Sequence, residues 1–134
     1  YGEIYLLSLK MFLDNPITGI GVNNFKYLCD QNNFYNVMMV HYECASHPHN
    51  IYIQWLAEGG LIVFIAFIVY LFFLILFIMK NKGEKEYKII SIAVILIMFW
   101  PVMSTGSLVK NWYGVSSFFI IGLCICLSRF KNNY

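Results

Sequence analysis

The sequence contains little charge. Asp, Glu, Lys and Arg make up only 12% of its 134 residues, about half of their share in a typical soluble domain. The net charge of +2 is small and its carriers cluster at the ends of apolar segments, a pattern that does not suggest a nucleic-acid-binding protein. Hydrophobic residues make up 60% of the chain. A composition this apolar predicts an integral membrane protein.

A secretory signal is also missing, because the first residues lack a cationic region followed by an apolar core. Tyr1 is not a natural start. We therefore expect the targeting information to lie upstream of Tyr1.

Metal ligands at a suitable spacing are missing as well. One cluster resembles a zinc site at first sight: His41, Cys44, His47 and His49. Structural zinc sites usually draw on two ligand pairs that are separated by a dozen or more residues, and this cluster has no such spacing. The sequence predicts neither a metal nor a cofactor.

The sequence does contain long apolar runs. They predict an all-α integral membrane fold, in which an external loop with short helices (1–58) precedes a membrane part (59–134). We place three transmembrane helices at about 61–79, 89–109 and 114–128, as part of a larger helical bundle. At about 1.5 Å per residue, the first run can cross a hydrocarbon core of roughly 30 Å.

Two cationic clusters predict the orientation in the membrane. The lysine-rich segment 80–88 follows the first span, and Arg129 and Lys131 follow the third. By the positive-inside rule both clusters lie in the cytoplasm, so residues 1–58 lie outside. Pro101 allows a kink near the outer end of the second span.

The predicted outer region begins with an amphipathic pattern over Glu3–Leu13, which Asn15-Pro16 ends. Gly19 and Gly21 then form a turn whose backbone N–H groups either approach a phosphate or serve only the turn. No strand precedes them, which excludes a dinucleotide-binding fold. The polar segment Lys26–Ser46 is expected to be an irregular external loop.

The cysteines allow two interpretations. Cys29 and Cys44 fall in the external loop, where a disulfide would stabilise the fold by about 3 kcal/mol. The alternative is a pair of unbridged thiols, since connectivity cannot be read from sequence. Cys124 and Cys126 lie in an apolar run, as small residues facing lipid or another helix.

Polar residues meet the most apolar segment at residues 47–63. Pro48 suits the first position of a helix, which makes His47 the expected N-cap and puts His49 in the first turn. The unpaired N–H groups and the helix dipole there favour an anion such as phosphate. The simpler alternative is a histidine at a membrane interface. Glu58, close to hydrocarbon, is either an interfacial carboxylate or a functional group.

Two stretches carry a family resemblance. The first is His49-Asn50 followed by Tyr52, Gln54, Leu56, Glu58, Gly60 and Leu61-Ile62. It resembles the His-Asn-x-Tyr/Leu-Leu-Gln-x-Leu-x-Glu-x-Gly-Leu-Ile-Gly signature of the bacterial O-antigen ligase and polymerase superfamily, whose members are integral membrane glycosyltransferases. Val63 stands where many members have a second glycine. The second stretch, residues 15–25, resembles the family's Pro-Leu-x-Gly-x-Gly-x-x-x-Phe segment.

The resemblance implies a C-terminal portion of a multi-pass enzyme of the bacterial cytoplasmic (inner) membrane, inactive as a fragment. The implied reaction moves a glycan from a polyprenyl (undecaprenyl) diphosphate carrier to a hydroxyl of a glycan or lipid-core acceptor, on the outer face of the bilayer. Such a polymerase or ligase makes surface polysaccharide, as lipopolysaccharide or capsule. No cofactor is implied.

The resemblance also implies roles for individual residues. His49 would activate the acceptor hydroxyl, while Lys110 and an arginine expected just before Tyr1 would hold the diphosphate. The supporting substrate-binding residues would be Asn50, Gln54, Glu58, Gly19 and Gly21.

A second class of function fits the composition, namely a non-catalytic membrane component such as a transporter fragment. In that case the external histidines only bind or gate. A positively charged external segment just before Tyr1, in a protein of about ten or more spans, would favour the enzyme.

The orientation is testable with single cysteines in a background that lacks native thiols. A cysteine at Asn33 should react with an impermeant thiol reagent from outside, whereas one at Gly83 should react only from the cytoplasm, because lysines flank it. Labelling of Gly83→Cys from outside would reverse the predicted topology.

Overall fold

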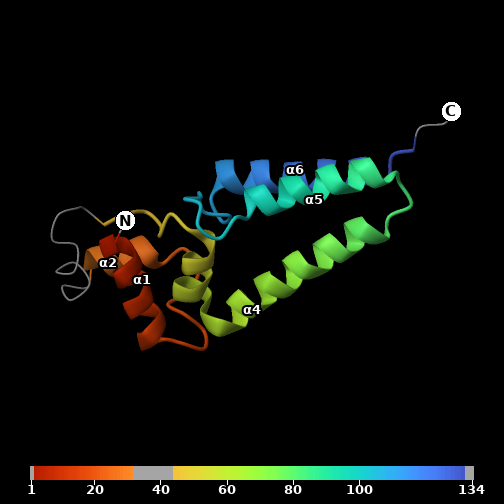
Figure 1. Ribbon diagram of the computed structural model, residues 1–134. Helices are drawn as coiled ribbons and strands as arrows, with labels where there is room; N and C mark the ends of the chain where they lie inside the picture. Colours follow the sequence, from red (N-terminus) through yellow and green to blue (C-terminus); the bar gives the residue numbers. More distant parts are fainter. Residues whose placement is uncertain (1, 32–43, 132–134) are drawn as a thin grey trace.

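The computed structural model describes residues 2–31 and 44–131, and this part of the chain is all-helical. Its helices, shown in Figure 1, are α1 (Gly2–Asp14), α2 (Phe25–Gln31), α4 (Ile51–Lys80), α5 (Lys85–Met98) and α6 (Asn111–Leu127). The predicted all-α class is confirmed for the described residues. Asn33 and His41 lie outside them.

α1 is the predicted amphipathic helix, extended by one residue at each end. It buries Leu7 and Met11 against the start of α4, in one core with Phe25 of α2. An exposed ion pair of 2.6 Å joins Lys10 and Asp14, which contributes little to stability at a wet surface. The helix ends before Pro16, as expected from the restriction on residues that precede proline.

α4 contains a sharp bend at Gly60, visible in Figure 1. Gly60 has φ 62° and ψ −165°, a conformation that only glycine adopts readily. We call residues 51–59 the short arm and residues 61–80 the long arm. The His-Asn motif thus begins a helix that changes direction before it enters the apolar run.

A loop of the second family stretch, residues 16–21, fills the break in α4. The break leaves backbone carbonyls of the short arm and amides of the long arm without helical partners. Four backbone hydrogen bonds satisfy them: Leu61 N to Pro16 O (2.9 Å), Ile62 N to Ile17 O (3.3 Å), Ile20 N to Ala57 O (3.0 Å) and Gly21 N to Glu58 O (2.9 Å). We call this arrangement the interlock. It joins the two sequence motifs into one structural unit.

α2 corrects the prediction that Lys26–Ser46 is irregular throughout. Phe25–Gln31 forms a short helix, because Leu28 N donates to Asn24 O and the Glu58 carboxylate accepts the Phe25 N–H. The second of these bonds links residues 33 positions apart and leaves no local pattern in the sequence.

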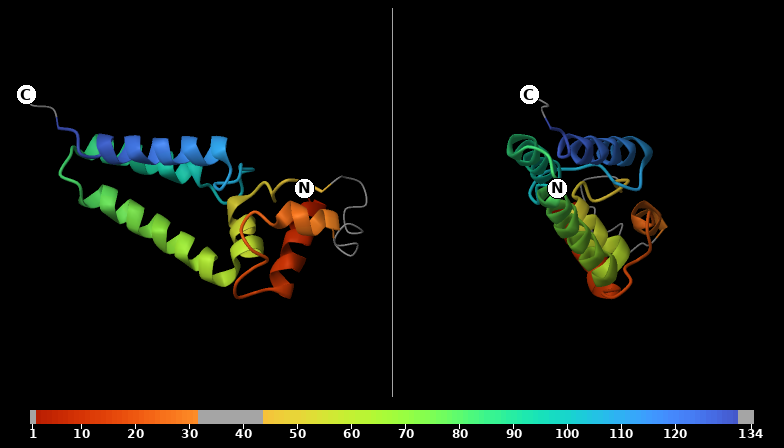
Figure 2. Two further views of the ribbon diagram at one scale, coloured as in Figure 1. Left: turned by 180° about the vertical axis from the view of Figure 1, so that it is seen from behind. Right: turned by 90° about the vertical axis from the view of Figure 1, so that its right-hand side faces the viewer.

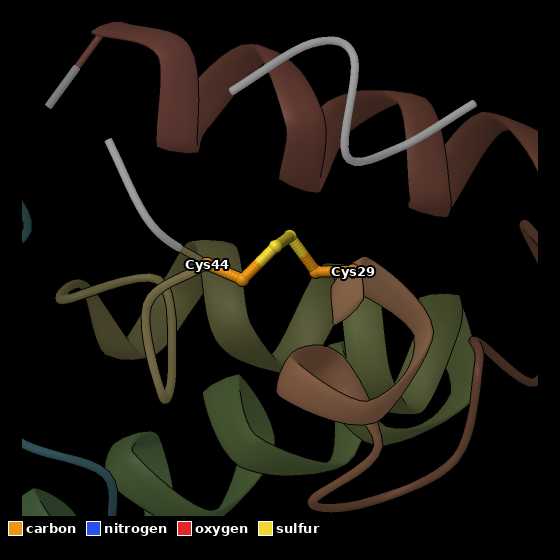
Figure 3. Close-up of a disulfide and its surroundings, with 2 residues drawn as sticks. All are labelled: Cys29 and Cys44. Carbon is orange, nitrogen blue, oxygen red and sulfur yellow. A yellow bond between two sulfur atoms is a disulfide. The ribbon is translucent and has the colours of Figure 1, made fainter. Parts of the chain in front are cut away.

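Cys29 of α2 is joined to Cys44 by a disulfide, the pairing that the sequence left open (Figure 3). The two Cα atoms lie 5.8 Å apart, and both side chains are buried in the core that α1 and the short arm share. The bridge attaches the segment that leads to His47 onto α2. Cys124 and Cys126 are unbridged.

α4 alone in the described part of the chain is long and apolar enough to cross a membrane, with a mean hydropathy of 3.4 over its most apolar window. α6, an apolar helix of 17 residues, lies close to the predicted third span. α5 has 14 residues, or about 21 Å at 1.5 Å per residue. Crossing by α5 and α6 therefore stays a prediction.

The expected extent of the second span, 89–109, is wrong. α5 ends at Met98, and Pro101 lies beyond the helix in a turn instead of kinking it. Proline has no N–H to continue a helix, and it disfavours helical geometry at the preceding residue, Trp100. Residues 99–110 form an irregular connection instead, which contacts the start of α4.

α5 and α6 lie side by side, while the long arm runs at an angle to them (Figures 1 and 2). The three share a second apolar core, made of Ile51, Phe67, Leu74, Ile78, Ile95, Phe99, Ile121 and Cys124. The short arm turns back from the bend toward the connection 99–110. This return brings the His-Asn motif to the connection between the C-terminal end of α5 and the N-terminal end of α6.

The interlock is testable by adding one methyl group. Gly60→Ala should destabilise the full-length protein by about 1–3 kcal/mol from backbone strain alone. The overlap of the new Cβ with the Ile17 carbonyl should add to this loss. Thermal unfolding in detergent measures the loss. Gly122→Ala on α6 is the matched control, because no atom lies within 4 Å of its Cβ position. Equal melting temperatures for the two variants would contradict the interlock.

Candidate active site

Asn50 is the N-cap of α4. Its side-chain oxygen accepts hydrogen bonds from Tyr52 N (3.0 Å) and Ile53 N (3.1 Å). The predicted N-cap His47 and first-turn position of His49 are therefore wrong, because asparagine caps far better and the helix starts after it. The two N–H groups are already used by Asn50 and are not available to an anion.

His49 precedes the cap in a left-handed backbone conformation, with φ 57°. For a residue with a side chain this conformation costs about 1–3 kcal/mol, and it recurs at functional sites. The His49 carbonyl accepts a hydrogen bond of 2.8 Å from Thr105 N, which holds the strained residue against the connection 99–110. His49 is half-buried.

The connection 99–110 encloses the start of α4. The Asn50 amide nitrogen donates to Pro101 O (2.7 Å) and Met103 O (3.4 Å), and the Tyr52 hydroxyl donates to Phe99 O (2.6 Å). Asn50 is only 5% exposed and both ends of its amide are occupied within the protein. These contacts hold Asn50, and with it the backbone of its neighbour His49, in place against the connection 99–110.

Gln54 and Glu58 form a buried polar network. The Gln54 amide nitrogen donates to Glu58 Oε2 (2.8 Å) and to Ser107 Oγ (2.7 Å), while Glu58 Oε1 accepts from Phe25 N (3.3 Å). Gln54, Glu58 and Ser107 are each at most 2% exposed. Since Phe25 is the first residue of α2, the carboxylate lies at the positive end of that helix dipole. The network holds α2, the short arm and the connection 99–110 together.

His47, His49 and Lys110 form a basic cluster before the helix. The two imidazole rings lie 4.4 Å apart between centroids, and Ser46 Oγ lies 2.9 Å from His47 Nδ1. Lys110 Nζ donates to Ser46 O at 3.1 Å, as expected if it shares the side of His49. Burial lowers the pKa of His47, and the nearby charges of His49 and Lys110 lower it further. A backbone hydrogen bond with Thr105 opposes this lowering of the His47 pKa.

Gly19 and Gly21 lie in the interlock. Gly19 N donates to Asn15 O (2.9 Å) and Gly21 N donates to Glu58 O (2.9 Å), so neither amide is free for a phosphate. A Cβ on Gly19, whose φ is +66°, would overlap the Glu58 backbone. The plain-turn interpretation accounts for both glycines, which allow the loop to approach α4 closely.

The family model described as O-antigen ligase matches residues 2–68. The chain belongs to the O-antigen ligase family. The match covers α1, both sequence motifs and the interlock, and it confirms the resemblance found in the sequence. No curated protein and no solved structure matches the chain. Family membership gives the chain a general role in surface polysaccharide biosynthesis, with glycosyltransferase-like activity, lipid-linked glycan substrates and a place in a membrane.

Sequence reasoning missed several groups that shape the site of this O-antigen ligase family member. They are the Phe25 amide, the Tyr52 hydroxyl, the Pro101 carbonyl, the Thr105 amide and the Ser107 hydroxyl. The signal for Ser107 was a polar stretch between two apolar runs, but its partner Gln54 lies 53 residues away. In the residues that the structure describes, no three His, Cys, Asp or Glu side chains are arranged to hold a metal ion.

The buried network predicts that Glu58 stabilises the fold of this family member. Glu58→Ala should destabilise the full-length protein by about 1–3 kcal/mol because the buried Phe25 N–H loses its acceptor, and by more because Gln54 Nε2 keeps only its bond to Ser107 Oγ. Thermal unfolding measures this loss, and exposed Glu86→Ala on α5 should cost less than about 1 kcal/mol. An unchanged melting temperature with a raised KM would instead make Glu58 a substrate contact.

Proposed function

We propose that this chain carries the acceptor-activating part of an enzyme that transfers a glycan from a polyprenyl diphosphate to an acceptor hydroxyl on the outer face of the membrane. One observation carries the proposal. His49 of the family motif is held in a strained backbone conformation, partly open to solvent, between Asn50 and the basic groups of the cluster.

The chemistry assigns a role to each group. The acceptor oxygen bonds to the anomeric carbon, the bond from that carbon to the diphosphate oxygen breaks, and the acceptor proton passes to His49. The diphosphate leaves with both electrons of the broken bond, so positive groups beside it lower the barrier. Lys110 and the arginine expected upstream of Tyr1 would supply them. This displacement needs no metal.

The place of His49 relative to the apolar run fits a lipid-linked donor. The short arm of nine residues, 51–59, spans about 14 Å and separates His49 from the long arm. A diphosphate on a prenyl chain lies at the membrane surface, which is the level at which this geometry would hold the basic cluster. Nucleotide sugars are absent outside the cytoplasm, so a donor there has to be carried by lipid.

The disulfide supports the outer location of the site. Disulfides persist in oxidising compartments and are rare in the cytoplasm. The Cys29–Cys44 bridge lies three residues before His47, on the same side of the long arm as the basic cluster. The lysines after the long arm would then lie in the cytoplasm of a bacterium, with the chain in its inner membrane.

The acceptor determines which of two reactions the enzyme performs. A growing glycan chain as acceptor gives a polymerase, and a lipid core gives a ligase. Both need the same activation of a hydroxyl by His49 and the same departure of the diphosphate, so the residues of this chain serve either reaction.

The test replaces His49 in the full-length protein. His49→Ala should lower transfer by about 10²–10⁴-fold, with lipid-linked repeat units accumulating, because the general base is lost. Expression and membrane insertion should stay normal, since His49 is only half-buried. Transfer is measured with purified lipid-linked glycan at equal protein levels.

His47→Ala is the matched control, because it removes the neighbouring imidazole 4.4 Å away and should be milder. His41→Ala should also be milder, and chelation should leave transfer intact. Equal, near-wild-type transfer in His49→Ala and His47→Ala would remove His49 from the mechanism and favour a non-catalytic membrane component.

A further inference from the structure

We infer that the end of α4 remote from His49 carries a headgroup site for an anionic phospholipid. An open hollow of about 440 Å³ lies there, lined by Lys80, Asn81, Lys82 and Arg129. Three of its four lining residues are cationic. The hollow lies at the far end of the membrane-length helix, and the inference is independent of the proposed glycan transfer.

Contacts between the α4–α5 turn and the end of α6 build the hollow. The Asn81 side-chain nitrogen donates to Ser128 Oγ at 2.6 Å, and Glu84 N donates to Phe130 O at 3.1 Å. The buried Ser128 hydroxyl is fixed in turn by a bond of 2.8 Å to Ile125 O. These bonds hold Arg129, which adjoins Ser128, beside lysines that lie 47 or more residues earlier in the chain.

The three cations have unsatisfied charge. Within the described ranges, none of Lys80, Lys82 and Arg129 forms an ion pair with a carboxylate. The Arg129 guanidinium lies over the Phe77 ring, 5.4 Å from its centroid, which orients the group and leaves its N–H donors for another acceptor. A phosphate accepts several such bonds at once and is a preferred partner of guanidinium.

Apolar side chains next to the hollow identify the anion as a lipid. Phe73, Phe77 and Met79 are 61%, 43% and 55% exposed on the last turns of α4. Phe77 lies about 5 Å along the helix axis from Lys80, so an acyl chain can lie on these side chains while its phosphate occupies the hollow. Free phosphate would use only the cationic half. Basic pockets at the ends of membrane helices bind anionic headgroups in this way.

If only the general attraction of cations to an anionic surface operated, every cation at this end would contribute equally. A defined site would instead depend on its lining cations alone, and this contrast supplies the control. Lys85 and Lys131 are exposed cations of the same end that do not line the hollow. At a defined site, the affinity for the anionic lipid depends on Lys82 and Arg129 and does not change when Lys85 or Lys131 is replaced. General attraction to an anionic surface depends equally on all four.

The experiment uses the full-length protein in detergent and native mass spectrometry with phosphatidylglycerol and phosphatidylcholine. Wild type should retain one phosphatidylglycerol in preference to phosphatidylcholine. The double variant Lys82→Gln/Arg129→Gln should bind phosphatidylglycerol about 25-fold more weakly, at about fivefold per cation removed. The control double variant Lys85→Gln/Lys131→Gln should stay within about twofold of wild type.

Three results would overturn the site. If both double variants bound phosphatidylglycerol equally weakly, general attraction to surface charge would explain the binding without a defined site. Equal retention of the two lipids by the wild-type protein would show that the hollow has no headgroup preference. This comparison uses only the wild-type protein, so it does not depend on whether a variant folds. Displacement of phosphatidylglycerol by millimolar inorganic phosphate would make the hollow a site for free phosphate.

Discussion

The structure depends on the break in α4 at Gly60 and on the loop that fills it. A continuous helix over residues 51–80 would point the short arm away from the connection 99–110. The break turns it back, and the carbonyls and amides it frees are satisfied by residues 16–21. Buried backbone groups without partners are costly, so the break and the loop require each other. The two family motifs thus form one structural unit, in which each satisfies backbone groups of the other.

Two routes lead from the interlock to His49. One follows the short arm to Asn50, which caps the helix and is bonded to Pro101. The other starts at Glu58, whose carboxylate holds the start of α2, and passes through the Cys29–Cys44 bridge to the segment before His47. The two routes fix the strained residue from both sides, as the general-base role that we propose for His49 would require.

Local chemistry made part of this structure predictable. The apolar run 61–79 became the long arm and the amphipathic pattern over Glu3–Leu13 became α1, because each buries or exposes a continuous face. The predicted helix start is wrong because Asn50, a strong N-cap, begins the helix after Pro48. Three contacts of the site could not be predicted, because pairings between residues far apart in the sequence leave no local pattern. They involve Ser107, Thr105 and the Phe25 amide, whose partners lie 53, 56 and 33 residues away.

Hydrogen exchange of the full-length protein tests the interlock most directly. Ile20 and Gly21 lie in a loop, yet their N–H groups donate to carbonyls of α4, so they should exchange as slowly as the central amides of α1. Exchange at the rate of an open loop, in protein that still keeps α4 protected, would contradict the account. It would mean that the loop does not fill the break and that the short arm is held some other way.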